Sequence, residues 1–324
     1  MSKPKVGFYW CASCGGCEEA VVDLAEDILN VVAAVDIVFW PVAMDFKRED
    51  VEKMADKEMT VCFVNGAIRT SEQFEMAELM RKKSQILIAF GSCSQHGGIP
   101  GLANLYNHQE LVNHSYLEAI SVTNPEKTIP QVELKVPEGK VTLPELWKTV
   151  KSLDQVIDVD YYIPGCPPPS KLLAEAVNAI LQGKLPPKGT VLAPDKALCT
   201  DCPRKETKPE KPLLKEYKRP SQVIVDPEKC LLAQGLLCLG PATRSGCDSA
   251  CVNGNMPCTG CMGPTSHVID FGAKALSAIA SLLDLNDEKE IAKAMEQIVD
   301  PVGTFNRYSL PASQLHRRVE PGNK

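Results

Sequence analysis

The sequence lacks any uninterrupted apolar run that could cross a lipid bilayer. Its longest apolar stretch, residues 21–44, is interrupted by polar and charged residues, namely Asp23, Glu26, Asp27, Asn30 and Asp36. No membrane span is therefore expected. Basic residues are not in excess either, because 35 Lys and Arg stand against 41 Asp and Glu and the net charge is −6. Nucleic-acid-binding surfaces usually carry a strongly basic face, so we expect no nucleic-acid partner.

The first residues also lack the features of a secretory signal. No charged segment, apolar core or pair of arginines precedes the first strand-like run, so we expect a cytoplasmic protein. Structural disulfides are disfavoured in a reducing cytoplasm. Closely spaced thiols in such a protein more often bind metal or act in redox chemistry.

Cysteine, by contrast, is abundant, with fourteen residues in 324. Cys11, Cys14 and Cys17 stand in the CxxCxxC spacing that opens a bacterial ferredoxin, but Val21 occupies the position of that motif's fourth cysteine. The motif is therefore incomplete as a local cluster site. Its further ligands must come from elsewhere in the chain.

Short runs rich in β-branched and aromatic residues predict five strands, at residues 5–10, 35–42, 59–65, 86–91 and 160–164. Helical patterns lie between them, at about residues 18–30, 71–83 and 170–182. This alternation predicts an α/β fold with a doubly wound parallel sheet covered on both faces. Single cores usually stop growing at roughly 250–300 residues, so we expect two domains, 1–190 and 191–324.

The remaining segments are less regular. Residues 100–158 are too long for a simple connection and are expected to cap the fold or face a partner. Residues 203–222 form a charged, proline-bearing connector, interpreted as a surface loop or a docking arm. Residues 199–261 have little apolar periodicity, so bound metal is expected to stabilise them. Helices are predicted near the end of the chain, at 267–285 and 288–298.

Cysteines follow several of the predicted strands. Ligands in open α/β sheets lie beyond the carboxyl ends of the strands, and Cys14 and Cys17, Cys93 and Cys166 follow the first, fourth and fifth strands. These four thiols should share one edge of the sheet. Soft sulfur ligands suit a 4Fe–4S cluster or zinc. Cys11 could take the place of Cys14.

Eight further cysteines fall into two sets by spacing, Cys199, Cys202, Cys230 and Cys238, and then Cys247, Cys251, Cys258 and Cys261. A CxxC pair with a long loop is also typical of zinc ribbons, so structural zinc stays an alternative, mainly for the first set. Twelve ligands leave only Cys11 and Cys62. Cys62 lies in a strand pattern and is interpreted as a small buried apolar residue.

Five motifs together carry a resemblance that extends over nearly the whole chain. They are SCGGCEE at 13–19, GSC at 91–93, PGCPP at 164–168, CLGPATRSGC at 238–247 and PCTGC at 257–261. Their order and combination resemble the small (gamma), electron-transferring subunit of NiFe hydrogenases. Within that family the chain looks most similar to the cytoplasmic methyl-viologen-reducing hydrogenases of methanogens.

The resemblance implies a flavodoxin-like N-terminal domain and three 4Fe–4S clusters. The proximal cluster would take Cys14, Cys17, Cys93 and Cys166, since the family's first ligand is the cysteine of its SCxxC signature. The medial cluster would take Cys247, Cys251, Cys258 and Cys261, and the distal cluster Cys199, Cys202, Cys230 and Cys238. Many family members carry histidine at the position of Cys199 and lack the cysteine at that of Cys251. Thiolates at both positions favour a low reduction potential.

The resemblance also implies partners. Hydrogen would be split at a NiFe centre in a separate large subunit, and electrons would leave to a 2Fe–2S, delta-type subunit and to heterodisulfide reductase in methanogenesis. A catalytic-subunit interpretation fails because His267 follows Cys261 by six residues with 57 residues still to come. The cluster subunit of quinone-reducing complexes shares the first domain but has adjacent cysteines in its first motif and lacks the C-terminal cysteines. The alternative function, from another functional class, is a zinc-bearing structural scaffold subunit without a redox role.

For three polar residues near these cysteines, the sequence allows more than one role. Glu18 and Glu19 could assist proton movement or only compensate the dipole at a helix N-terminus. His96, beside Cys93, could donate to a cluster sulfur or be an ordinary surface histidine.

Overall fold

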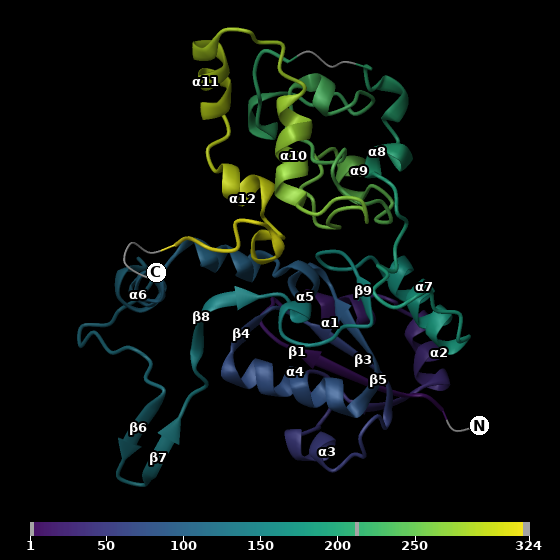
Figure 1. The fold of residues 1–324 in the computed structure, drawn as a ribbon, viewed down its shortest axis with the longest axis vertical. Helices are drawn as coiled ribbons and strands as arrows, with labels where there is room; N and C mark the ends of the chain where they lie inside the picture. Colours follow the sequence, from purple (N-terminus) through teal and green to yellow (C-terminus); the bar gives the residue numbers. More distant parts are fainter. Residues whose placement is uncertain (1–2, 211–213, 320–324) are drawn as a thin grey trace.

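The computed structural model describes residues 3–210 and 214–319, and its N-terminal part is built on a five-stranded sheet (Figure 1). The strand order is β2-β1-β3-β5-β9, and all neighbouring pairs are parallel. The strands are β1 (Lys5–Trp10), β2 (Asp36–Phe39), β3 (Met59–Asn65), β5 (Ser84–Phe90) and β9 (Tyr161–Ile163). The predicted doubly wound parallel sheet is confirmed, in the order typical of flavodoxin-like folds.

Helices cover both faces of this sheet and explain why its strands are apolar on both sides. On one face pack α1 (Gly16–Val22), α2 (Asp27–Ala34) and α7 (Ser170–Leu181), and on the other α3 (Arg48–Glu52) and α4 (Ser71–Lys83). Two apolar cores result, one on each face. Phe8, Phe63 and Ile163 belong to the first core, and Cys62 and Leu87 to the second.

The predicted helix at 18–30 is wrong as a single element, because the chain forms α1 and α2 with a turn between them. Ala25 has φ 51°, in the left-handed region, which ends the helical path. By contrast, α4 matches its prediction from residue 71 to 83. Its start is fixed by a capping box, in which Thr70 Oγ1 accepts from the Gln73 N–H at 3.3 Å and Gln73 Oε1 accepts from the Thr70 N–H at 3.1 Å.

The excursion expected at 100–158 has structure of its own. After α5 (Ser92–His96) come the 3₁₀ helix η1 (Ile99–Leu105), α6 (His108–Asn113) and the π-helical turn η2 (His114–Glu118). A separate hairpin of β6 (Glu133–Val136) and β7 (Gly139–Thr142) follows, and then β8 (Leu146–Lys151), which pairs with β4 (Ile68–Thr70), and the 3₁₀ turn η3 (Leu153–Gln155). In Figure 1 the hairpin extends away from the body at the lower left.

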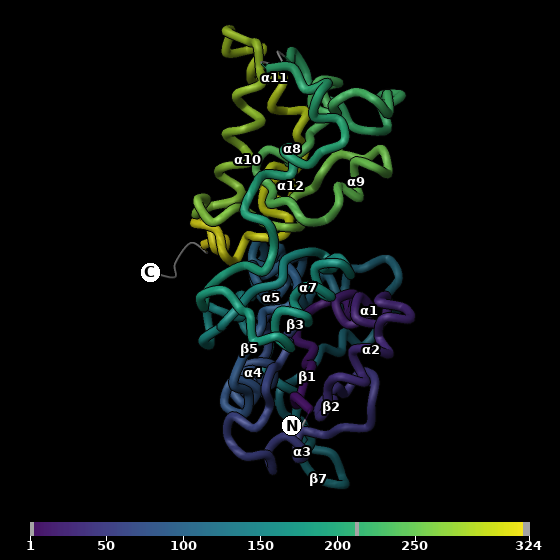
Figure 2. Tube along the Cα trace, turned by 90° about the vertical axis from the view of Figure 1, so that its right-hand side faces the viewer, coloured from purple at the N-terminus to yellow at the C-terminus, as the bar shows by residue number. Residues whose placement is uncertain are grey.

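The C-terminal part stacks on the end of the sheet where β1, β5 and β9 finish, as Figure 2 shows. Its helices are α8 (Leu198–Asp201), α9 (Ala250–Asn253), α10 (Phe271–Ala280), α11 (Glu288–Glu296) and α12 (Pro301–Phe305), with short 3₁₀ turns at Lys205–Thr207, Pro220–Gln222, Leu232–Gln234 and Leu310–Ala312. The two predicted C-terminal helices correspond to α10 and α11. No helix within the described residues is both long and apolar enough to cross a membrane.

The C-terminal part has an apolar core, which the sequence pattern did not predict. Among residues 191–210 and 214–319, sixteen buried residues form this core, including Leu232, Phe271 and Ile279. Within the connector at 203–222, Leu214 and Tyr217 are buried in the same core, and the Tyr217 hydroxyl donates to the Ile279 carbonyl at 2.8 Å. The expectation of a solvated loop is therefore wrong for these two residues. Residues 211–213 of the connector lie outside the described residues, and the domain boundary near 190 stays a prediction.

Candidate metal centres

The first cysteine set, called the proximal set, is Cys14, Cys17, Cys93 and Cys166. These residues come from the three segments that follow the carboxyl ends of β1, β5 and β9, where the sequence placed them, with Cys17 in the first turn of α1 and Cys93 in α5. The thiols are close enough to interact electrostatically with one another. Gly91 shows how tightly the loops approach, because a Cβ at this position would overlap Cys17 Sγ. Its φ of 87° also favours glycine.

The proximal thiols lie in an environment that disfavours bare thiolates. Burial, and then the neighbouring thiols of Cys93, Cys166 and Cys14, raise the pKa of Cys17 far above its usual range. Burial and the same kind of repulsion raise the pKa of Cys93 to about 12. Cys14 differs from Cys17 and Cys93 in being exposed. Without a compensating cation, Cys17 and Cys93 would stay protonated, and a bound metal cluster would supply that cation.

The second set, called the distal set, is Cys199, Cys202, Cys230 and Cys238. Cys199 lies in α8 and Cys202 at its C-terminal end. Gly240 brings two members together, because a Cβ there would lie 3.3 Å from Cys199 Sγ and 3.7 Å from Cys238 Sγ. Burial raises the pKa of Cys199 to about 11; the nearby Lys208 lowers it, and the other three thiols of the set raise it.

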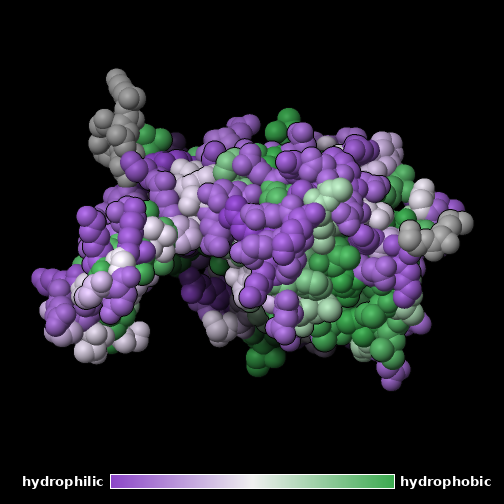
Figure 3. Space-filling view, turned by 90° about the horizontal axis from the view of Figure 1, so that it is seen from below, coloured by the Kyte–Doolittle hydropathy of each residue, from purple (hydrophilic) through white to green (hydrophobic). Residues whose placement is uncertain are grey.

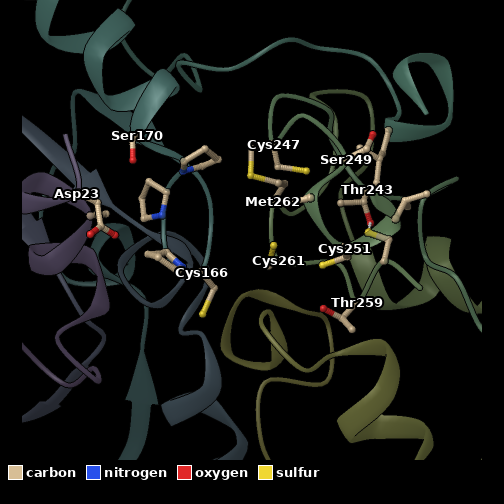
Figure 4. A pocket seen from close by; sticks show the side chains of 18 residues that line it. Asp23, Cys166, Ser170, Thr243, Cys247, Ser249, Cys251, Thr259, Cys261 and Met262 are labelled. Atoms are coloured by element: carbon tan, nitrogen blue, oxygen red, sulfur yellow. Dashed lines mark hydrogen bonds between the residues drawn. The ribbon is translucent and has the colours of Figure 1, made fainter. Parts of the chain in front are cut away.

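The third set, called the medial set, is Cys247, Cys251, Cys258 and Cys261. All four line a cavity of about 320 Å³ between the two parts of the chain, and Cys166 of the proximal set lines it as well. Figure 4 shows the side chains of Cys166, Cys247, Cys251 and Cys261 around this cavity. Burial raises the pKa of Cys261 to about 12; a backbone hydrogen bond from Cys166 opposes the rise, and the thiols of Cys247, Cys251 and Cys166 add to it.

The medial set contacts both the proximal set and the distal set. Between the proximal and medial sets, Cys166 neighbours Cys261, and the Ser92 hydroxyl donates to the Cys261 carbonyl. Between the medial and distal sets, the Cys258 N–H donates to Cys238 Sγ at 3.3 Å. Cys258 therefore touches the distal set although its spacing groups it with the medial one. The geometry gives a row in the order proximal, medial, distal.

The three sets fit iron–sulfur clusters in number and chemistry, since each comprises four cysteine thiols that are at least partly shielded from water as a group. Across residues 3–210 and 214–319, no group of three or more His, Cys, Asp or Glu side chains is arranged to hold a single metal ion. The assignment of the twelve cysteines to three clusters stays a prediction.

The two remaining cysteines lie in the core rather than in a set. Cys62 is fully buried, as the strand pattern predicted. Cys11 is 5% exposed and belongs to the same core cluster. Burial, and then the neighbouring Cys62, raise the pKa of Cys11 above its usual range. This placement supports Cys14 rather than Cys11 as the proximal ligand.

The adjacent acids Glu18 and Glu19 have different environments. Glu19 is exposed, whereas Glu18 is 4% exposed, and its carboxylate accepts hydrogen bonds from Trp40 Nε1 and, at 2.6 Å, from Asn65 Nδ2. Burial raises the pKa of Glu18, and both hydrogen bonds oppose the rise. Compensation of the helix dipole alone therefore does not explain the position of Glu18, which is buried and hydrogen-bonded. Trp40 and Asn65 were not predicted, because they come from distant segments of the chain.

His96 is not a surface histidine. Its Nε2 atom is buried and has no hydrogen-bond partner among the residues that the structure describes, and a Cβ on Gly263, two residues beyond Cys261, would overlap it. Burial and the nearby Arg244 lower the pKa of His96 to about 4. Arg244, another residue that the sequence did not single out, donates to the Pro264 carbonyl at 3.0 Å and pairs with Asp195 at 3.0 Å. Arg244 therefore holds the loop that follows Cys261, and His96 packs against the same loop at Gly263.

A family model matches the N-terminal part of the chain. Residues 14–180 match the family of the NADH ubiquinone oxidoreductase 20 kDa subunit. The match spans all four proximal cysteines and ends before the eight C-terminal ones.

Full-length relatives extend the likeness to the rest of the chain. The chain is 39% identical over 318 residues to the iron–sulfur subunit of the F420-non-reducing hydrogenase of Archaeoglobus profundus, covering 97% of this chain and 98% of that protein. It is 37% identical over 326 residues to the corresponding F420-non-reducing hydrogenase subunit of Methanothermobacter thermautotrophicus, covering 99% of each. Among solved structures, the [NiFeSe] hydrogenase of Desulfovibrio vulgaris Hildenborough aligns with a TM-score of 0.53 at 16% identity, over 82% of this chain and 94% of that one, which is a likeness of fold alone.

Proposed function

The chain belongs to the family of iron–sulfur subunits of F420-non-reducing hydrogenases, and on that premise we propose that it conducts electrons through three 4Fe–4S clusters. As a hydrogenase subunit, it is part of an oxidoreductase complex whose catalytic centre lies on the large subunit. The clusters, when bound, supply one-electron redox chemistry. The protein supplies their ligands, their spacing and their exclusion from water.

One observation carries this proposal, the row formed by the three cysteine sets. Cys166 neighbours Cys261, and Cys258 donates its N–H to Cys238 Sγ. Ligands of successive clusters would thus contact one another, which favours a continuous relay. A scaffold that used zinc for stability alone would not need its sites in contact.

We assign the ligands as the resemblance implies, with Cys14, Cys17, Cys93 and Cys166 on the proximal cluster. The medial cluster takes Cys247, Cys251, Cys258 and Cys261, and the distal cluster Cys199, Cys202, Cys230 and Cys238. Thiolates at every position make each cluster more negative and lower its reduction potential.

We further propose a cytoplasmic location and a 2Fe–2S, delta-type subunit as the immediate electron acceptor, with heterodisulfide reductase beyond it. Relatives from methanogens support this setting. Electrons entering at the proximal set would leave from the distal set, which lies at the opposite end of the row.

The test is metal analysis of anaerobically purified protein, together with its electron paramagnetic resonance spectra. Three cubane clusters amount to about twelve irons per chain. Cys251→Ala should convert the medial cluster to a three-iron form, or remove it, and change its resonance alone. Zinc without visible absorption would establish the scaffold instead, and a markedly lower iron content would end the three-cluster proposal.

A further inference from the structure

The hairpin of β6 and β7, with the flanking Val132 and Leu143, forms an amphipathic arm. Leu134 pairs with Val141, and the Leu143 N–H donates to the Val132 carbonyl at 2.9 Å. Side chains alternate along strands, so these four apolar residues share one face. Each of the four is about half exposed, at 55% for Val132, 49% for Leu134, 52% for Val141 and 53% for Leu143.

The opposite face of the arm is polar. Glu133 pairs with Thr142 across the strands and forms an ion pair with Lys140 at 2.5 Å, beside the exposed Lys135. The arm therefore has one face suited to water and one suited to burial. In Figure 3 it forms a separate lobe at the left, with a hollow between it and the body. An isolated two-stranded hairpin is at best marginally stable in water, so its apolar face needs a covering partner.

The arm is joined by strand pairing to the loop that carries the most exposed proximal thiol. Ala12, two residues before Cys14, exchanges two backbone hydrogen bonds of 2.9 Å with Ala67. Strand β4 begins at the next residue and pairs with β8, and β8 follows directly from the arm. A partner that covers Cys14 can therefore continue along this edge onto the arm.

We propose that the apolar face of the arm docks the catalytic large subunit. This inference rests on the proposed function, because electrons from the catalytic subunit must enter the relay at the proximal set, and Cys14 is its exposed member. Permanent subunit interfaces are large and more apolar than transient ones. The part of the chain that leads from Cys93 to the arm carries further exposed apolar side chains, at Ile99, Tyr106, Tyr116, Leu117 and Ile120. The large subunit would cover Cys14 and bury the arm's apolar face in one interface.

The test uses this chain co-expressed with its hydrogenase large subunit and purified through a tag on this chain. Leu134→Lys with Val141→Lys places two charges on the apolar face. Glu133→Ala with Thr142→Lys changes the net charge by the same +2 on the polar face of the same hairpin, by removing one negative charge and adding one positive charge. We expect the first double variant to retain at most about one tenth of the large subunit that the wild type retains, because it forces two charges into an apolar interface. The control should retain the wild-type amount within about twofold.

Three results would overturn the proposal. Equal retention by both double variants would show that the arm does not dock the large subunit. Loss of the large subunit only with Leu29→Lys, on the exposed face of α2, would move the interface there. A change from dimer to monomer in the isolated chain, with full retention of the large subunit, would identify a second copy as the occupant. Iron content of each sample separates this proposal from the relay, since the arm variants should keep wild-type iron whether or not they dock.

Discussion

The two parts of the chain hold their cysteines in different ways. In the sheet part, three segments that follow strands of the parallel sheet bring the proximal set together. Cys17 and Cys93 are both buried, but only Cys17 is a member of one of the two apolar cores of that part. In the C-terminal part, Cys238 and Cys258 are core residues, and Cys202, Cys230 and Cys247 pack against the same core. The sheet therefore has a core that is largely independent of its metal site, whereas the C-terminal core and its metal sites are one structure.

The largest expected consequence concerns metal removal. Extraction of iron under anaerobic conditions should open the C-terminal core, because buried thiols would lose the cations that hold them together. The sheet should stay folded. We expect hydrogen exchange in 198–262 to accelerate at least on the order of hundredfold, with little change in β3 and β5. Exchange measured by mass spectrometry checks this, and equal loss of protection in both parts would refute the comparison.

Gly91→Ala should break the proximal set alone. Its added Cβ would overlap Cys17 Sγ at a position with φ 87°, so we expect loss of about four of the twelve irons. Gly183→Ala is the matched control, because Gly183 also has positive φ but has no atom within 4 Å of the added Cβ. Iron analysis of both variants checks the prediction. Full iron content in Gly91→Ala would place the proximal cluster elsewhere.

The fold and the site can be predicted from the sequence where a feature depends on local pattern or on strand order. The strands follow from apolar runs and α4 from its helical pattern. The meeting of the segments that carry Cys17, Cys93 and Cys166 follows from the rule for parallel sheets. Prediction from the sequence fails where contacts join distant segments. The hydrogen bonds from Trp40 and Asn65 to Glu18, and the burial of Tyr217 against α10, depend on packing that no local period encodes.

Asp160→Asn tests the independence of the sheet. Asp160 accepts from Arg81 and Lys188, both at 2.6 Å, and from the Leu87 N–H at 2.8 Å. Removing the charge should lower the free energy of unfolding by about 2–4 kcal/mol, because it leaves the mostly buried Arg81 side chain poorly paired. All three tryptophans, Trp10, Trp40 and Trp147, lie in the sheet part, so their fluorescence in a urea titration reports on this part.

The effect of Asp160→Asn on the free energy of unfolding should depend on pH. Burial alone would raise the pKa of Asp160, but hydrogen bonds from Arg81, Lys188 and Leu87 hold it below its usual 3.8. The carboxylate's contribution is therefore complete above pH of about 4 and is lost as pH falls through the lowered pKa. The difference between wild type and Asp160→Asn should shrink in acid. A difference that grew in acid would contradict this assignment.

The smallest effects should come from two helix caps, one in each part. Thr70→Ala removes the cap of α4, and Asp270→Ala removes that of α10, where Asp270 accepts from the Ala273 and Gln314 N–H groups at 2.9 Å each. Each should cost about 1 kcal/mol in the iron-loaded protein. After iron removal, Thr70→Ala should keep its effect on exchange in α4, whereas Asp270→Ala should lose its effect because α10 would already be open. A persistent Asp270→Ala effect would mean that the C-terminal core forms without its metal.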